Sequence, residues 1–226
     1  MSKYHSSLTD ADGIHEPKGV TGASSGEVYV ATGNGSGTWS KVEQLGNAKA
    51  DTFELNTSVD EIVRVELLLG RPPSTGGATF GTVNTNGSGS LGVGAFLFAS
   101  GATNSVYFTA ELPNSIEASS IVSPRIMWLS TTANSGDVMW GLEYSMDVKG
   151  QQSNSTTVDT IISTAPSATK YLTEAKFSDI TGSNVKAGTV LNCRLYRIGG
   201  DASDTYPDDA AALSMVFKYK KNKLGI

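Results

Sequence analysis

The chain has 226 residues, of which only 17% are charged, and acidic residues outnumber basic ones by 22 to 17. A formal net charge of −5 excludes the broad positive surface that a nucleic-acid partner requires. The length suffices for one large β domain or for a smaller domain with an appendage. Frequent glycine, serine, threonine and asparagine indicate short strands joined by turns and little helix.

The cysteine count and the hydropathy pattern exclude further classes of protein. Cys193 is the only cysteine, which excludes an intrachain disulfide and a thiolate metal cluster. The N-terminus has no charged-then-apolar signal pattern, and the longest uncharged apolar stretch, Leu91 to Ala99, is too short to span a bilayer. We therefore expect synthesis in a cytoplasm and no membrane partner.

The N-terminal segment has the pattern of an attachment device. Residues Met1 to Gly26 show neither alternating nor helical periodicity, which predicts an extended arm. Glu27 to Ala31 and Thr38 to Val42 are short strands around a glycine-rich turn, and they predict a hairpin. Because a lone hairpin is only marginally stable in water, Tyr29 and Trp39 are expected to pack on another surface.

The rest of the chain is dominated by strand patterns. Asp137 to Lys149 has apolar residues at alternate positions, which predicts a long strand with one buried face and favours a bend or bulge along it. After a linker at Gln44 to Asp51, the predicted strands are Ile62 to Leu69, Ala78 to Val83, Leu91 to Phe98, Val106 to Leu112, Ile121 to Leu129, Asp137 to Lys149, Thr157 to Ser163, Tyr171 to Phe177, Thr189 to Ile198 and Leu213 to Lys220.

These elements predict an all-β fold. It is a jelly-roll-type antiparallel β-sandwich over residues 47–226, preceded by an extended N-terminal arm and a small β-hairpin over residues 1–46. Trp128 and Trp140 have inward parity and are predicted to pack in the core rather than to stack on sugars. Lys218, Lys220, Lys221 and Lys223 are predicted to be solvated on an exposed terminal strand edge.

Two segments resemble parts of known viral proteins. The run His5 to Val20, followed by Gly26 to Ala31 and Gly35 to Trp39, resembles the N-terminal anchor of tailed-bacteriophage head-decoration and head-fibre proteins. Similar anchors occur in some phage tail proteins. The resemblance implies that capsid or trimer anchoring is performed by His15, Glu16, Pro17, Lys18, Tyr29 and Trp39.

The second resemblance lies in the C-terminal half. Arg125 to Trp128, Gly136 to Tyr144, Leu172 to Phe177 and Ala187 to Asp209 are similar to a β-sandwich module common in phage structural proteins, which implies a homotrimer. Residues Asp51 to Ser120 match neither segment, so receptor specificity stays open.

Together the resemblances imply a structural virion protein on the outer surface of a phage head. It would decorate and stabilise the capsid as a cement protein, bind the major capsid protein and be made in the host cytoplasm. The alternative is a tail-fibre or tail-tip protein that binds a host surface glycan through Arg71 to Gly77 and Asn84 to Ser90. No enzyme is predicted, because nothing pairs Glu111, Glu117 and Glu143 as a glycosidase would require.

No metal or cofactor is predicted either. The densest acidic cluster is Asp201, Asp204, Asp208 and Asp209. It could hold Ca²⁺, but it lacks the central glycine and terminal glutamate of an EF-hand loop, so side-chain turns to the backbone are the preferred interpretation. His5 and His15 could bind a metal on a trimer axis, but hydrogen bonding to a partner is preferred.

Overall fold

The computed structural model describes residue 24 and residues 27–33, 36–41, 53–84, 92–151, 155–167 and 170–224. The strands are β1 (Glu27–Gly33), β2 (Ser36–Lys41), β3 (Phe53–Glu66), β4 (Thr79–Asn84), β5 (Gly92–Phe98), β6 (Thr103–Glu111), β7 (Ser123–Ser130), β8 (Gly136–Asp147), β9 (Thr157–Ala165), β10 (Leu172–Lys176), β11 (Val190–Ile198) and β12 (Ala210–Leu224). A 3-10 turn, η5 (Leu67–Leu69), follows β3. Within the described ranges, no helix has the length and hydrophobicity needed to cross a bilayer.

The predicted hairpin is confirmed as β1 and β2, which pair antiparallel. The register places Tyr29 directly opposite Trp39, and a register shift between Ala31 and Gly33 leads into the turn. The hairpin belongs to a compact unit distinct from the unit Leu55–Lys223. The predicted extended arm lies outside the described residues.

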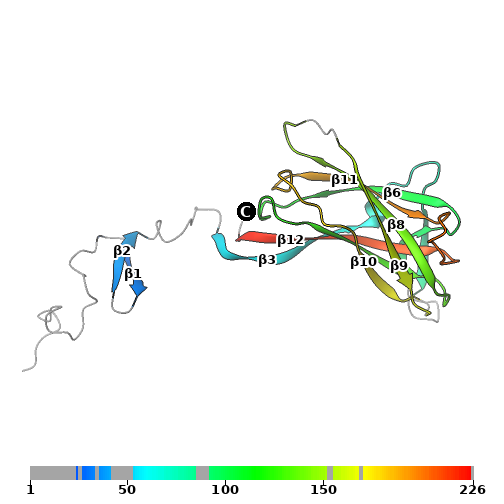
Figure 1. Cartoon of the computed structure of the whole chain (residues 1–226), viewed down its shortest axis with the longest axis horizontal. Helices are drawn as coiled ribbons and strands as arrows, with labels where there is room; N and C mark the ends of the chain where they lie inside the picture. The colour runs from blue at the N-terminus through cyan, green and yellow to red at the C-terminus, as the bar shows by residue number, and fades with distance from the viewer. Residues whose placement is uncertain are drawn as a thin grey trace, which may run out of the picture. The chain divides into compact units, whose positions relative to one another are not determined.

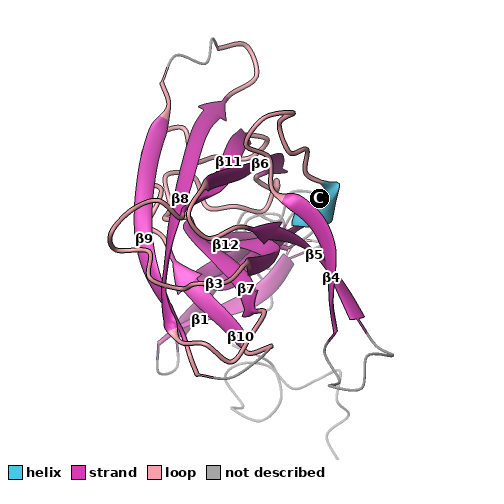
Figure 2. Cartoon of the chain, turned by 90° about the vertical axis from the view of Figure 1, so that its right-hand side faces the viewer, coloured by secondary structure: helices cyan, strands magenta, loops and turns pink. Residues whose placement is uncertain are grey.

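The unit Leu55–Lys223 is a sandwich of two antiparallel sheets (Figures 1 and 2). One sheet has the order β10-β7-β12-β5-β4, with β3 also paired to β12, and the other has the order β6-β11-β8-β9. From β5 onward, β5, β7, β10 and β12 enter the first sheet and β6, β8, β9 and β11 the second, which is the winding of a jelly roll. The predicted all-β jelly-roll sandwich is confirmed.

Two tryptophans occupy the core between the sheets. Trp128 on β7 and Trp140 on β8 are fully buried, with ring centroids 6.0 Å apart in an edge-to-face arrangement. Phe98 packs edge-on against Trp140 at 5.1 Å, and Trp128 Nε1 donates a hydrogen bond to Ser163 Oγ at 3.0 Å. Their burial confirms the predicted core role, so neither ring can stack on a ligand.

All ten strands predicted after the linker are present. The largest difference in their ends is in β3, which begins at Phe53 rather than Ile62 and pairs with β12. β8 keeps an unbroken register with both β11 and β9, so no bulge interrupts it. The bulge occurs instead in β12, between Ala212 and Ser214.

β12 is an inner strand of its sheet. It pairs with β7 on one side, while on the other its first residues pair with β5 and the strand also pairs with β3. Asp60 of β3 forms ion pairs with Lys218 Nζ at 2.6 Å and Lys220 Nζ at 2.8 Å, and Glu61 pairs with Lys221 at 3.2 Å. The predicted solvated edge is therefore wrong for these lysines, because β3 supplies carboxylates beside them.

Asp60 provides a test of this pairing. Hydrogen bonds from Lys218 and then Lys220 lower the pKa of Asp60 from about 3.8 to about 2. A carboxyl group whose pKa is lowered by folding contributes stability above its unfolded-state pKa and loses it as the pH falls through the folded-state value. We therefore expect Asp60→Asn to lower the urea midpoint slightly at neutral pH, and this difference to shrink between about pH 4 and pH 2. Urea unfolding at several pH values checks this; a difference that stays constant down to pH 2 would contradict it.

Candidate functional site

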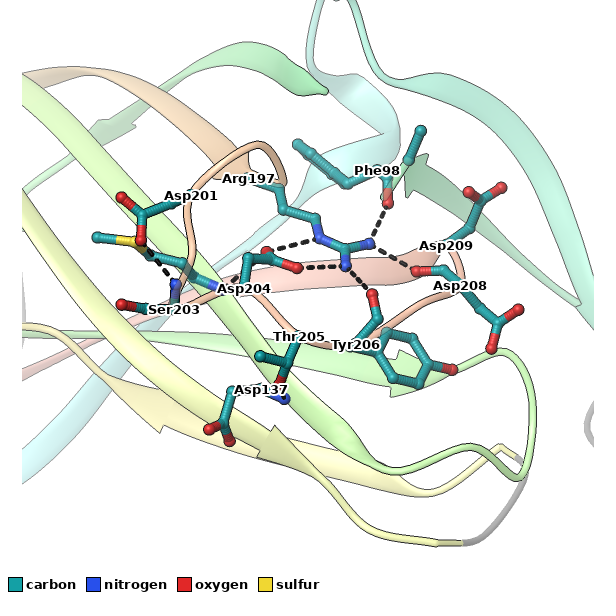
Figure 3. Close-up of polar contacts among 12 residues, drawn as sticks. Phe98, Asp137, Arg197, Asp201, Ser203, Asp204, Thr205, Tyr206, Asp208 and Asp209 are labelled. Carbon is teal, nitrogen blue, oxygen red and sulfur yellow. Dashed lines mark hydrogen bonds and ion pairs between the residues drawn. The ribbon is translucent and has the colours of Figure 1, made fainter. Parts of the chain in front are cut away.

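The acidic loop between β11 and β12 is organised around one buried arginine (Figure 3). Arg197, on the inward face of β11, is fully buried. Its Nε and Nη2 donate to the two carboxylate oxygens of Asp204 at 2.9 and 2.7 Å. The Asp204 side chain is only 1% exposed, and it also accepts a hydrogen bond from the backbone N–H of Met139 at 3.0 Å.

Backbone carbonyls accept the remaining donors of this guanidinium. Nη1 donates to the carbonyl oxygens of Phe98 at 2.9 Å and Asp208 at 2.6 Å, and Nη2 donates to that of Tyr206 at 2.5 Å. All five N–H groups of Arg197 therefore have acceptors, which is what a buried arginine needs. The loop is held by a structural ion pair that was not predicted from the sequence.

Two other carboxylates of the cluster accept hydrogen bonds, Asp201 within the loop and Asp208 from the turn between β7 and β8, so the predicted side-chain turn is wrong for Asp208. Asp201 Oδ1 accepts from the Ser203 N–H at 2.8 Å, which confirms the turn interpretation for this residue. Asp208 Oδ2 accepts from Thr132 Oγ1 at 2.6 Å and from Asn134 Nδ2 at 2.8 Å, and these bonds lower the pKa of Asp208. Within the described part of the chain, no three His, Cys, Asp or Glu side chains come together in a way that could hold a metal ion.

Most residues predicted to anchor the chain lie outside the described residues. Those outside are His15, Glu16, Pro17 and Lys18, and also His5. Tyr29 and Trp39 lie in β1 and β2, opposite each other in the register. Their role as anchors stays a prediction.

The two loops of the alternative prediction are described in part. Arg71 exchanges backbone hydrogen bonds of 2.8 and 3.0 Å with Tyr107, and Gly77 forms a bridge with Ser105. The loop Arg71 to Gly77 is therefore attached to the edge of β6. In the second loop, Asn84 ends β4 and residues 85–90 lie outside the described residues.

The candidate catalytic groups are spread over the sandwich. Glu111 ends β6, Glu117 lies in the connection to β7, and Glu143 lies on β8. Glu143 accepts a hydrogen bond from Arg194 at 3.2 Å. Burial raises the pKa of the Cys193 thiol to about 12, so this group is not a nucleophile near neutral pH.

A groove of about 590 Å³ lies on the outer face of the four-stranded sheet. The buried neighbours Val106, Leu191 and Leu142 face the core, so the residues next to them on each strand face outward. The register arranges the outward side chains of the groove in two rows across β6, β11 and β8. One row is Tyr107, Arg194 and Glu143, and the other is Thr109, Asn192 and Ser145.

Tyr196 and Gly141 flank the first row. They are register partners on β11 and β8, and a Cβ on Gly141 would lie 2.2 Å from the Tyr196 ring, so only glycine leaves room for that ring. The Arg194 guanidinium packs over the same ring, 4.8 Å from its centroid. Burial raises the pKa of Tyr196, although the charge of Arg194 opposes this shift.

The groove was not predicted from the sequence. The available signal was the alternation along β11, where polar or aromatic residues at 192, 194 and 196 separate buried residues at 193 and 195. Alternation shows that these side chains face outward. It does not show that Tyr107 and Glu143 lie beside Arg194, because that depends on the register of three strands.

Comparison with known proteins leaves the family open. No family model and no curated protein matches the sequence. Among solved structures, the chain is similar to the CBM36-1 domain of a xylanase from a Trinervitermes trinervoides hindgut metagenome, at 11% identity and a TM-score of 0.36, covering 70% of this chain and 96% of that one. It is also similar to CBM35 from Cellvibrio japonicus Abf62, at 12% identity and a TM-score of 0.34, covering 73% and 97%. A third similarity is to infectious bursal disease virus, Gx strain, at 7% identity and a TM-score of 0.36, covering 85% and 36%.

These similarities are too low to assign a function. The jelly-roll assignment rests on the strand order of the two sheets and not on them.

The Arg197 network gives a stability prediction. Replacing Arg197 by methionine leaves the buried Asp204 carboxylate without its cation, which typically costs about 3 to 5 kcal/mol. Arg194→Met is the matched control, because the half-exposed Arg194–Glu143 pair is expected to contribute less than about 1 kcal/mol. Urea unfolding of both variants measures the difference; equal losses would show that the Arg197 network does not stabilise the loop as described.

Proposed function

We propose that this chain is a structural protein of a tailed-bacteriophage particle, which decorates and stabilises the outside of the capsid as a cement protein. The observation that carries the proposal is the presence of a two-stranded hairpin in a compact unit distinct from the jelly roll. A two-stranded hairpin alone is marginally stable in water, so it is best explained as a segment that docks on a partner.

The jelly roll is consistent with attachment by a separate segment, because it has a hydrophobic core of its own. Its main hydrophobic cluster is formed by residues between Val63 and Tyr219, all within the unit Leu55–Lys223. Trp128, Trp140 and the Arg197 network lie inside this unit. A domain with its own core can project from a surface while another segment attaches it.

In this proposal residues 1–46 bind the major capsid protein. The anchoring contacts are made by the segment His15 to Lys18 and by Tyr29 and Trp39, in keeping with the resemblance of His5 to Val20 to phage head anchors. A homotrimer presents three such segments at once, and this multivalency offsets the entropy lost when each segment becomes ordered on binding. The protein then lies on the outer surface of the head. We propose no catalytic role.

The second candidate is receptor binding by a tail fibre or tail tip. It is favoured by the groove on the four-stranded sheet, whose lining includes Arg71 from the loop predicted for this function. Mass spectrometry of purified virions separates the two. A copy number comparable to that of the major capsid protein supports decoration, whereas a handful of copies per particle supports the tail.

The attachment proposal is tested by deleting residues 1–46. The truncated chain is expected to stay folded, because the jelly-roll core lies within residues 55–223, and to lose binding to particles that lack this protein. Circular dichroism checks folding, and co-sedimentation with the particles measures binding. Full decoration by the truncated chain would overturn the assignment of the anchor.

Point variants sharpen this test within the full chain. Replacing both Tyr29 and Trp39 by alanine is expected to weaken co-sedimentation, because the proposed docking contact would lose both aromatic rings. Tyr171→Ala is the matched control, since Tyr171 is an exposed tyrosine of the sandwich. If the double variant binds as well as the control, the hairpin is not the docking element.

A further inference from the structure

The groove on the outer face of β6, β11 and β8 has the size and form of a ligand site. Its volume of about 590 Å³ falls in the range of small-molecule sites, roughly 300 to 1,000 Å³. It crosses the strands, so one ligand can touch side chains from all three. These side chains stand on regular strands of a sheet, which hold them more firmly than loops would.

The first row of the groove balances its charges. Arg194 is the cation of the first row and Glu143 the anion, and they form a salt bridge of 3.2 Å. In the second row, Asn192 Nδ2 donates to Asp147 Oδ2 at 2.5 Å, which fixes the amide beside the groove. A site of this kind suits a neutral ligand with many hydroxyl groups, because carboxylate, amide, hydroxyl and guanidinium groups offer both acceptors and donors.

One donor in the groove has no protein partner. Within the described part of the chain, Arg194 Nε is buried and makes no hydrogen bond. Because this atom is buried, a ligand oxygen can reach it only if the Arg194 side chain moves.

One aromatic ring of the first row is open to such a ligand. Tyr107 is 47% exposed, whereas the Tyr196 ring is covered by Arg194 and packs against Gly141. A tyrosine combines an apolar ring face with a polar hydroxyl, so it suits a sugar ring, which has apolar C–H faces and polar edges. Tyr107 therefore provides the apolar surface that the polar rows lack.

Two other ligand classes fit the groove less well. The charged residues of the lining are Arg71, Arg194 and Glu143, and the Asp147 carboxylate lies beside Asn192. This is too little positive charge for a nucleic acid or another polyanion. A peptide added as an extra strand needs a free sheet edge, but β11 and β8 are paired on both sides, and Arg71 and Gly77 already bridge to the β6 edge.

We propose that this groove binds a neutral oligosaccharide, with Tyr107 stacking on a sugar ring and Arg194, Glu143 and Asn192 hydrogen-bonding its hydroxyl groups. The site lies wholly within the jelly roll, so the proposal goes beyond capsid attachment and does not depend on it. On a particle, such a site would give the exposed domain an affinity for neutral surface glycans.

The experiment starts with the full chain on an array of neutral hexose and N-acetylhexosamine oligosaccharides. The strongest binder is then titrated by calorimetry against the full chain and its variants. We expect Tyr107→Ala to weaken binding by about tenfold or more, as removal of a central aromatic anchor does. Glu143→Gln keeps the size of the side chain and is expected to weaken binding through loss of a charged acceptor.

Tyr171→Ala is the matched control, because Tyr171 is a 56% exposed tyrosine that does not line the groove. It is expected to bind the oligosaccharide like the unchanged chain. Absence of binding on the array overturns the proposal, and so does binding that Tyr107→Ala and Glu143→Gln leave unchanged. Co-sedimentation of Tyr107→Ala with particles is expected to be normal, so failure here is distinguishable from failure of the attachment proposal.

Discussion

The closing crossover of the jelly roll depends on one buried charge. Arg197 ends the inward face of β11 in one sheet, and its guanidinium bonds to the carbonyl of Phe98 at the end of β5 in the other. Asp204 neutralises it and also accepts the N–H of Met139 on β8. The interaction therefore ties strands of both sheets to the loop that carries the chain into β12. Because a buried arginine without acceptors is prohibitively costly, the loop can adopt only conformations that present its carbonyls to this group.

Alternation in the sequence is enough to predict the strands, because each sheet has one face buried in a common core. The inward parity of Trp128 and Trp140 follows from the same rule. Alternation does not predict which strands are neighbours, and the lysines show the consequence: Lys218 and Lys220 look like an exposed edge until β3 is known to lie beside β12. Arg197 stands at an inward position after Leu195, but the sequence offers several aspartates as its partner. Only the path of the loop selects Asp204.

The proposed anchor and the groove also differ in how far a local sequence pattern can reveal them. The proposed anchor is a local string, His15 to Lys18 with the hairpin beyond it, so a resemblance can point to it although most of it lies outside the described residues. The groove is a nonlocal feature. Tyr107, Glu143 and Arg194 come from three strands and meet only because the registers of β6 with β11 and of β11 with β8 align them. Register depends on the pairing of whole strands, so no local pattern contains it.

The outer faces of the two sheets also have different chemistry. On the first sheet, Ala95 and Ala211 are small enough for Leu97 and Leu213 to pack with them, and this forms a second apolar cluster outside the main core. The outer face of the second sheet is polar. It carries the Tyr196 ring packed on Gly141 and the Arg194–Glu143 ion pair, and the exposed Tyr107 lies beside them. A jelly roll buries only one face of each sheet, so its outer faces can change without loss of the core. If the hairpin unit performs attachment, the second sheet needs no contact with the capsid, and its groove can serve a soluble or surface-bound ligand.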